Sequence, residues 1–184
     1  MTKICIIRHG QTDWNVTSRL QGQTDTVLNN KGREQARQAG LAIKEIEWHS
    51  VISSPLLRAK ETAEIVSEIL GLDGVATDDG LRERSYGQAE GLTLKERTEA
   101  YPDRQYEGME DWEALRDRMM ETIQRYASDQ HNLVLVSHGA AINSVLHTLS
   151  GGAYGSGITK LHNGCITMLT FSDQQLIVDY YNRV

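Results

Sequence analysis

The chain has 184 residues, which is enough for one domain with a large core. Apolar residues make up 39% and charged residues 24% of it, proportions that are ordinary for a globular protein and exclude disordered and fibrous classes. The formal net charge of −6 argues against nucleic acid as the main partner, because binding a phosphate backbone requires a basic face. A local arginine cluster can still bind one small phosphate ester. No stretch is apolar and long enough to cross a bilayer, so no membrane partner is expected.

The two cysteines, Cys5 and Cys165, both lie in apolar runs, and neither has a CxxC partner. Buried free thiols are therefore expected rather than a disulfide or a zinc site. The opening residues, MTKICIIRHG, reach polar side chains after a single lysine, which is unlike a signal peptide. Together these features favour a reducing, cytoplasmic location.

In chain order, the first predicted element is a buried strand. Lys3–Arg8 is a short apolar run rich in isoleucine, and it delivers Arg8 and His9 at its end. The elements expected next are a loop over Thr12–Asn30, a helix from about Asn30 to Ile46 and a short strand at Ser50–Ser53. His9 is therefore expected at the carboxyl end of a strand.

A second helix is predicted directly after the second strand. Ser54-Pro55 is a typical helix start, with serine as the N-cap and proline at the first helical position. The helix should reach Leu70 and end at Gly71, because glycine is common just beyond a helix. Further along, Thr93-x-x-Glu96 matches a capping box that opens another helix.

An amphipathic helix is predicted from Trp112 onwards. The apolar residues that keep helical spacing are Leu115, Met119, Ile123 and Tyr126. We expect Arg116 and Arg118 on its solvated face. The remaining predicted elements are a buried strand at Asn132–Val136, a helix at Ala140–Leu149 and a terminal hairpin of Ile166–Phe171 and Leu176–Tyr181.

Strands that alternate with helices predict an α/β fold, a three-layer α/β/α sandwich around a mainly parallel sheet. Residues 1–184 are expected to form one domain, with a short cap-like segment at about residues 92–111. In such folds, ligands bind beyond the carboxyl ends of the strands. Arg8-His9 and Ser137-His138 both lie at such ends, so the candidate site is expected there.

Phosphoryl transfer through an enzyme nucleophile requires few groups. It requires a nucleophile at a strand end, cations for the equatorial oxygens and an acid for the leaving oxygen. His9 is the candidate nucleophile and Glu83 the candidate acid. The candidate cations are Arg8, Arg58 and His138. A glycine follows each histidine, which allows a substrate to approach the backbone closely or simply serves a turn.

Longer motifs surround these residues. In chain order they are Arg8-His9-Gly10; Thr12-x-Trp14-Asn15; Arg19-x-Gln21-Gly22-x-x-Asp25-x-x-Leu28; Gly32-x-x-Gln35-Ala36; Ser53-Ser54-Pro55-Leu56-x-Arg58-Ala59-x-x-Thr62-Ala63; Leu81-Arg82-Glu83 with Gly87 and Glu90-Gly91; and Val136-Ser137-His138-Gly139. Together they resemble the histidine phosphatase superfamily, also called the phosphoglycerate mutase-like family. The motifs follow the family order over nearly the whole chain, which is far more specific than Arg-His-Gly alone.

The resemblance implies a role for each candidate. His9, as a neutral imidazole, would form a covalent phosphohistidine while its other ring nitrogen donates to a backbone carbonyl. Arg8, Arg58 and His138 would stabilise the charge on the phosphoryl oxygens. Glu83 would protonate the leaving alkoxide and then, as a carboxylate, activate the water that cleaves the phosphohistidine.

The resemblance also implies the residues that complete the phosphate site. Asn15 and Gln21 would donate hydrogen bonds, and Gly22 and Gly139 would lie against the phosphate. These donors would do what magnesium does in other phosphoryl-transfer enzymes, so neither a metal nor another cofactor is expected.

A purely structural interpretation exists for each candidate. Arg58 could be a solvated helix cation, Glu83 a surface ion pair and His138 a satisfied core histidine. These interpretations do not explain why the motifs occur together in this order. No chemical role is expected for the other histidines, which match no motif and no metal-site spacing: His49, His131, His147 and His162.

We expect a phosphatase that acts on a small phosphorylated metabolite. The main alternative is a cofactor-dependent phosphoglycerate mutase, because Leu81-x-Glu83-Arg84-x-Tyr86-Gly87 is similar to the corresponding stretch of those enzymes. Against the mutase, the segment Leu92–Asp111 is short, and its cations are dispersed rather than paired: Lys95, Arg97 and Arg104. Gln11 and Gln23 also differ from the Glu and Trp that mutases usually show. A non-catalytic phosphate-binding or regulatory module is the weaker alternative, because every catalytic position is filled.

The sequence leaves the substrate open. Broad-specificity, ribazole phosphate and fructose-2,6-bisphosphate phosphatases all share these motifs. Trp14, Tyr101 and Tyr106 could line a partly apolar mouth of the site or could be packing residues. A monomer and a homodimer both remain open.

Overall fold

A six-stranded mixed sheet forms the centre of the computed structural model, which describes residues 1–129 and 131–184. The strand order is β3-β2-β4-β1-β5-β6. Four strands are parallel: β1 (Thr2–Arg8), β2 (Ser50–Ser53), β3 (Ala76–Thr77) and β4 (Leu133–Ser137). The hairpin of β5 (Ile166–Ser172) and β6 (Gln175–Arg183) joins them antiparallel. The predicted mainly parallel sheet and the terminal hairpin are confirmed.

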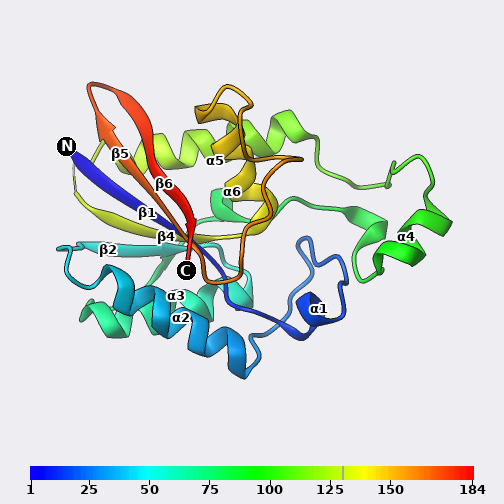
Figure 1. Ribbon diagram of the computed structural model, residues 1–184, viewed down its shortest axis with the longest axis horizontal. Helices are drawn as coiled ribbons and strands as arrows, with labels where there is room; N and C mark the ends of the chain where they lie inside the picture. The colour runs from blue at the N-terminus through cyan, green and yellow to red at the C-terminus, as the bar shows by residue number, and fades with distance from the viewer. Residues whose placement is uncertain (130) are drawn as a thin grey trace.

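Helices cover both faces of this sheet (Figure 1). On one face lie α2 (Asn30–Ile43) and α3 (Leu57–Leu70), and on the other lie α5 (Trp112–Ala127) and α6 (Gly139–Leu149). Side chains of a strand alternate between its two faces. In β1, Ile4 and Ile6 accordingly enter the core under α5 and α6, whereas Cys5 and Ile7 enter the core over α2 and α3. The three-layer sandwich is thus confirmed.

Several local predictions also hold. Thr93 and Glu96 form a reciprocal capping box that opens α4 (Leu94–Ala100). Gly71 ends α3 in the left-handed conformation, with φ of 68°. Cys5 and Cys165 are buried and free, as expected from their apolar surroundings.

The start of α3 differs from the prediction. The helix begins at Leu57, with Leu56 as an N-cap that makes no side-chain hydrogen bond. Ser54 precedes the helix in a different role, because its Oγ lies 2.8 Å from Nε2 of His138. The local N-cap signal was wrong because a long-range partner engages the hydroxyl.

The segment 12–30, predicted as a loop, contains one helical turn. α1 (Asp13–Val16) opens with a capping box between Thr12 and Asn15. The next helix, α2, ends at Ile43, three residues before the predicted Ile46. The extra turn matters because it fixes the side chain of Asn15.

The predicted cap-like segment lies on the side of the molecule where the parallel strands end. Figure 1 shows α4 projecting there, with α1 lower and closer to the sheet. Two 3₁₀ turns, η1 (Asp79–Leu81) and η2 (Gly87–Ala89), lead into it. Isolated bridges pair Arg19 with Thr93 and Tyr86 with Met109, which tie both ends of the segment to the neighbouring loops. Within the described parts of the chain, no helix combines the length and the apolar character that a membrane span requires.

Close backbone contact between α2 and the loop after β1 requires glycine at residue 32. A Cβ on Gly32 would lie 2.2 Å from the carbonyl oxygen of Gln11, and one on Gly10 would lie 2.2 Å from that of Gly32. Gly40, on the same helix, faces only the flexible side chain of Ile69, with a Cβ distance of 3.1 Å. The first turn of α2 therefore packs directly on the loop that follows His9.

We expect Gly32→Ala to destabilise the protein by about 1–3 kcal/mol through overpacking, although alanine is the better helix former. Gly40→Ala is the matched control on α2, with an expected change below about 1 kcal/mol because Ile69 can adjust. The measurement is the free energy of unfolding in urea. A Gly32→Ala protein as stable as the unmodified chain would contradict the proposed contact.

Candidate active site

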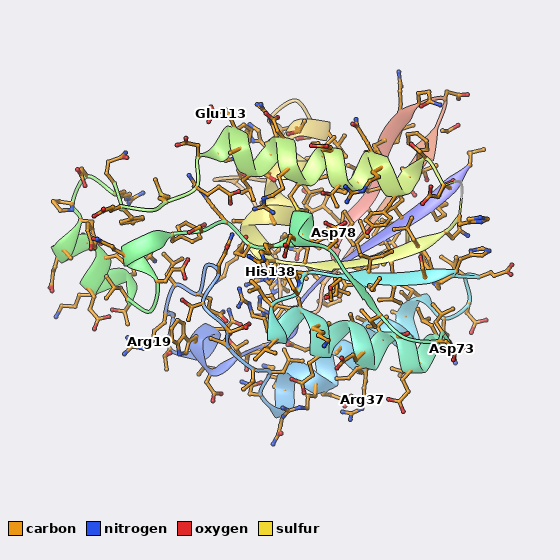
Figure 2. The ribbon with its side chains drawn as sticks, turned by 180° about the vertical axis from the view of Figure 1, so that it is seen from behind. Arg19, Arg37, Asp73, Asp78, Glu113 and His138 are labelled. Carbon is orange, nitrogen blue, oxygen red and sulfur yellow. The ribbon has the colours of Figure 1, made fainter. Side chains whose placement is uncertain are left out.

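The two histidines of the site are brought together by the pairing of β1 with β4. In the parallel register Arg8 pairs with Ser137, and the backbone N–H of His9 donates to the carbonyl of Ser137 at 3.0 Å. His9 and His138 follow directly, and their ring centroids lie 5.2 Å apart. In Figure 2, His138 lies in the interior, between the two helical layers. The sequence prediction that both histidines meet at the strand ends is confirmed.

The ring of His9 has a defined tautomer. Nδ1 lies 2.7 Å from the carbonyl oxygen of Gly10. Because a carbonyl only accepts, Nδ1 carries the hydrogen, and Nε2 of the neutral ring keeps its lone pair. Burial lowers the pKa of His9 well below its usual value, and the charges of Arg58 and Arg8 lower it further. His9 is therefore neutral near pH 7, with Nε2 available as a nucleophile.

Two cations flank this imidazole, and backbone carbonyls hold both. Arg8 donates from Nη1 to the carbonyl of Leu161. The side chain of Arg58 is completely buried and donates to the carbonyls of Gly22 at 2.6 Å and Thr24 at 2.9 Å. Burial lowers the pKa of both residues, that of Arg58 to about 10. A guanidinium is not deprotonated in proteins near pH 7, so both side chains are cations. Within the described residues, Nε of each arginine has no hydrogen-bond partner.

The loop that holds Arg58 is itself fixed by Glu90. The carboxylate accepts hydrogen bonds from the backbone N–H groups of Gln23, Thr24 and Tyr86 at 3.0, 2.8 and 3.0 Å. Gly22 adopts φ of 53°, and a Cβ there would lie 2.1 Å from Oε1 of Glu90. Glu90 therefore has a structural role, and Gly22 is required for its close approach.

Asn15 and Gln21 both have their carbonyl oxygens engaged, which orients their amide groups. Oδ1 of Asn15 accepts from the backbone N–H of Thr12 at 3.0 Å. Oε1 of Gln21 accepts from the hydroxyls of Thr12 and Thr26 at 2.9 and 2.5 Å. No described residue accepts a hydrogen bond from the amide nitrogen of either side chain. Both amides are thus free to donate to a ligand.

Glu83 lies at the N-terminus of α6. Its Oε1 accepts from the backbone N–H groups of Arg84 and Ala141, each at 2.9 Å, and its Oε2 accepts from that of Ala140 at 3.1 Å. Hydrogen bonds from backbone N–H groups and the positive end of a helix dipole both stabilise a carboxylate. The arrangement therefore suits the ionised form of Glu83.

Arg118 supports the segment that carries Glu83. Its guanidinium pairs with Glu110 at 2.9 Å and donates to the carbonyls of Gly80 and Arg82 at 2.8 and 3.0 Å. The prediction that Arg118 lies on a solvated face was wrong, because helical spacing says nothing of the irregular loop that covers this part of α5. Arg116 is closer to that prediction, since it pairs with the exposed Asp117.

Two further residues that the sequence reasoning missed act on the backbone near His9. Asn163 donates from Nδ2 to the carbonyl of His9 at 3.2 Å, and the backbone N–H of Gly164 donates to that of Arg8 at 3.0 Å. Asn163-Gly164 precedes β5, and Asn-Gly is an ordinary turn signal. Local sequence therefore gave no reason to place it beside the nucleophile.

A cavity of about 340 Å³ opens at these side chains. Eight of the nine predicted site residues line it: Arg8, His9, Asn15, Gln21, Gly22, Arg58, Glu83 and Gly139. The ninth, His138, is completely buried and is not part of this lining. A Cβ on Gly139 would lie 3.3 Å from Nε of Arg8, so glycine here allows the guanidinium to pack on the start of α6.

The remaining lining differs from the sequence expectation. Tyr86 lines the cavity, whereas Trp14, Tyr101 and Tyr106 do not. Tyr101 and Tyr106 pack edge to face, with centroids 5.2 Å apart, so packing is the correct interpretation for them. None of His49, His131, His147 and His162 lines the cavity either. In the part of the chain that the structure describes, no three His, Cys, Asp or Glu side chains form a group that could hold a metal ion.

Comparison with known proteins identifies the family. The model described as "Histidine phosphatase superfamily (branch 1)" matches residues 4–184. This chain belongs to the histidine phosphatase superfamily. The resemblance inferred from the sequence motifs is thus confirmed.

Individual relatives cover nearly the whole chain. It is 43% identical to the Bacillus subtilis (strain 168) protein named "Uncharacterized phosphatase PhoE", over 99% of this chain and 95% of that one. It is 31% identical to "Probable phosphoglycerate mutase GpmB" of Salmonella choleraesuis (strain SC-B67), over 95% and 87% of the two chains. The solved mycobacterial glucosyl-3-phosphoglycerate phosphatase with VO3 matches with a TM-score of 0.89 and 27% identity, over 100% of both chains. The chain is therefore an enzyme of this superfamily, and its relatives include phosphatases.

Proposed function

We propose that the protein hydrolyses small phosphate monoesters through a phosphohistidine on His9, without a metal or another cofactor. The observation that carries this proposal is the state of His9. Its Nδ1–H is engaged by Gly10, so Nε2 keeps a lone pair at a cavity whose wall includes Arg8, Arg58 and Glu83. A neutral nucleophile that shares the wall of a cavity with two cations and a carboxyl group matches what phosphoryl transfer requires.

In the first half of the proposed reaction, Nε2 of His9 attacks phosphorus, and the P–O bond to the leaving group breaks. Arg8 and Arg58 stabilise the charge on the equatorial oxygens, and Asn15 donates a hydrogen bond to them. Glu83 transfers its proton to the leaving oxygen, which departs as an alcohol.

In the second half, water replaces the alcohol. The carboxylate of Glu83 takes a proton from this water while its oxygen bonds to phosphorus and the P–N bond breaks. Inorganic phosphate leaves, His9 recovers its lone pair, and Glu83 is protonated again. The hydrogen bonds from Ala140 and Ala141 support this step, since they suit the ionised carboxylate.

A cavity of about 340 Å³ supports a small phosphorylated metabolite as the substrate, rather than nucleic acid or a membrane. The buried free thiols of Cys5 and Cys165 fit a reducing, cytoplasmic compartment. The second candidate is a phosphoglycerate mutase, which the likeness to the GpmB relatives favours. Against it, the three cations of the cap-like segment are absent from the lining of the cavity: Lys95, Arg97 and Arg104.

The central test traps the intermediate. After a quenched turnover with labelled substrate, the protein should carry phosphate that is acid-labile and alkali-stable, and both label and activity should persist in EDTA. His9→Ala should lose both, and His49→Ala, on an exposed histidine away from the cavity, should keep both. A fully active His9→Ala protein would refute the proposed nucleophile, and loss in EDTA that magnesium restores would refute the metal-free reaction.

The role of Glu83 is tested with two classes of leaving group. Glu83→Gln should slow the hydrolysis of alkyl phosphates by about 10²–10⁴-fold, because an alkoxide requires a proton to leave. Aryl phosphates with acidic phenols should be affected much less in the phosphorylation step. The measurement is the single-turnover rate of phosphorylation for each class. Equal losses for both would assign the acid role to another group.

The choice between phosphatase and mutase depends on the acceptor. A mutase must retain its phosphohistidine against water, and the dispersed cations of residues 92–111 offer no anchor for a second anionic group in the cavity. We expect release of inorganic phosphate from monoesters without priming by 2,3-bisphosphoglycerate, and poor interconversion of 3- and 2-phosphoglycerate. Both rates are to be measured with and without the bisphosphate. Isomerisation that is faster by orders of magnitude and requires priming would replace the phosphatase with a mutase.

A further inference from the structure

Ser54 makes a buried contact with the second histidine of the site. Its Oγ lies 2.8 Å from Nε2 of His138, and both side chains are completely buried. The backbone N–H of Ser54 donates to the carbonyl of Val136 at 2.9 Å, which fixes the serine against the end of β4. Ser54 lies in the short connection between β2 and α3, so the partner of His138 directly precedes the helix that carries Arg58.

The position of each hydrogen in this contact follows from its neighbours. Oγ of Ser54 also accepts from the backbone N–H of Leu56 at 3.3 Å, and this nitrogen can only donate. Among the described residues, the hydroxyl hydrogen therefore has a single acceptor, Nε2 of His138. A neutral imidazole carries one hydrogen, which must then lie on Nδ1.

The opposite assignment is less favourable. If Nε2 of His138 carried the hydrogen, the hydroxyl hydrogen of Ser54 would be buried without an acceptor among the described residues. Nδ1 of His138 has no partner among these residues in either tautomer, so the hydroxyl decides between them. A buried polar group left without its hydrogen bond is costly. Burial, together with the charges of Arg58 and other neighbouring groups, lowers the pKa of His138 well below its usual value, so the ring is neutral.

We propose that Ser54 is a positioning residue that holds His138 in the neutral Nδ1–H tautomer, so that Nδ1–H is the hydrogen-bond donor to the phosphoryl group. The inference rests on the proposed function, because it takes the phosphoryl group to bind at His9. The two imidazoles, with centroids 5.2 Å apart, then have opposite tautomers. His9 presents a lone pair for attack, and His138 presents a hydrogen for the oxygens.

The tautomer matters because the alternative would oppose binding. With its hydrogen on Nε2, His138 would direct a lone pair at negatively charged phosphoryl oxygens. A protonated His138 would add a third positive charge beside Arg8 and Arg58, and burial opposes that charge. The contact with Ser54 supplies a donor without adding charge near the nucleophile.

The experiment is ¹⁵N NMR of histidine-labelled protein, which distinguishes a protonated ring nitrogen from one with a lone pair. In the unmodified protein, Nδ1 of His138 should be the protonated nitrogen and Nε2 the one with the lone pair. Ser54→Ala should no longer hold His138 in one tautomer. It should also reduce kcat/KM by about tenfold or more, the size of effect that is known when a residue that orients a metal-binding histidine is lost. Inhibition by inorganic phosphate should weaken with it.

Ser53→Ala is the matched control. Ser53 is also buried, but its hydroxyl donates to the carbonyl of Ser54 at 2.8 Å and does not contact His138. We expect this variant to keep the tautomer of His138 and to change kcat/KM by less than about twofold. Ser54→Thr keeps the hydroxyl and should restore the tautomer.

The proposal can be refuted by the NMR measurement of the tautomer alone, without any measurement of catalysis. A hydrogen on Nε2 of His138 in the unmodified protein, or an unchanged Nδ1–H tautomer in Ser54→Ala, would refute it. If Ser54→Ala does not fold, the unmodified protein alone decides the tautomer. Failure to trap phosphate on His9, with the tautomer as stated, would instead refute the proposed function, so the two failures are distinguishable.

Discussion

The parallel pairing of β1 with β4 is the constraint on which the site depends. Parallel strands end at the same edge of a sheet, and here the register that pairs Arg8 with Ser137 places His9 beside His138. A shift of one residue would turn every side chain of β1 to the opposite face. Because β1 supplies side chains to both cores, such a shift would disrupt both at once. Core packing therefore holds the register that places the two histidines side by side.

The two buried arginines of the site, Arg8 and Arg58, are held by groups that leave their positive charge available to a ligand. The guanidinium groups of Arg8 and Arg58 donate to backbone carbonyls of Leu161, Gly22 and Thr24 rather than to carboxylates. Carbonyl dipoles satisfy the N–H groups without neutralising the cation, so an incoming phosphate does not have to displace a paired acid. Glu90, which contacts the loop that holds Arg58, directs its carboxylate oxygens at backbone N–H groups instead. A protein with a net charge of −6 can thereby keep a cationic cavity.

Local sequence signals predicted most of the elements, because strands and capping boxes are encoded over a few positions. The motifs also named residues that the structure gathers around one cavity. Local signals failed where the decisive partner is distant in the chain. Ser54 has the local pattern of an N-cap, but its hydroxyl contacts His138, 84 positions away. Arg118 has the spacing of a solvated helix residue, but its guanidinium donates to the carbonyls of Gly80 and Arg82. In both cases the partner lies far away in the chain, and no local pattern or helical periodicity predicts such a contact.

The N-terminus of α6 connects the two halves of the proposed reaction. His138 directly precedes this helix, and the first two N–H groups after Gly139 donate to Glu83. Once Glu83 has given its proton to the leaving group, it carries a negative charge in a site that already holds a phosphoryl group. The positive end of the helix dipole stabilises that charge where water cannot fully solvate it. The start of α6 therefore does two things: it places the buried His138, and in the proposed reaction it stabilises the carboxylate of Glu83 before this group accepts a proton from water. Because α6 follows β4 directly, the position of β4 in the sheet fixes both.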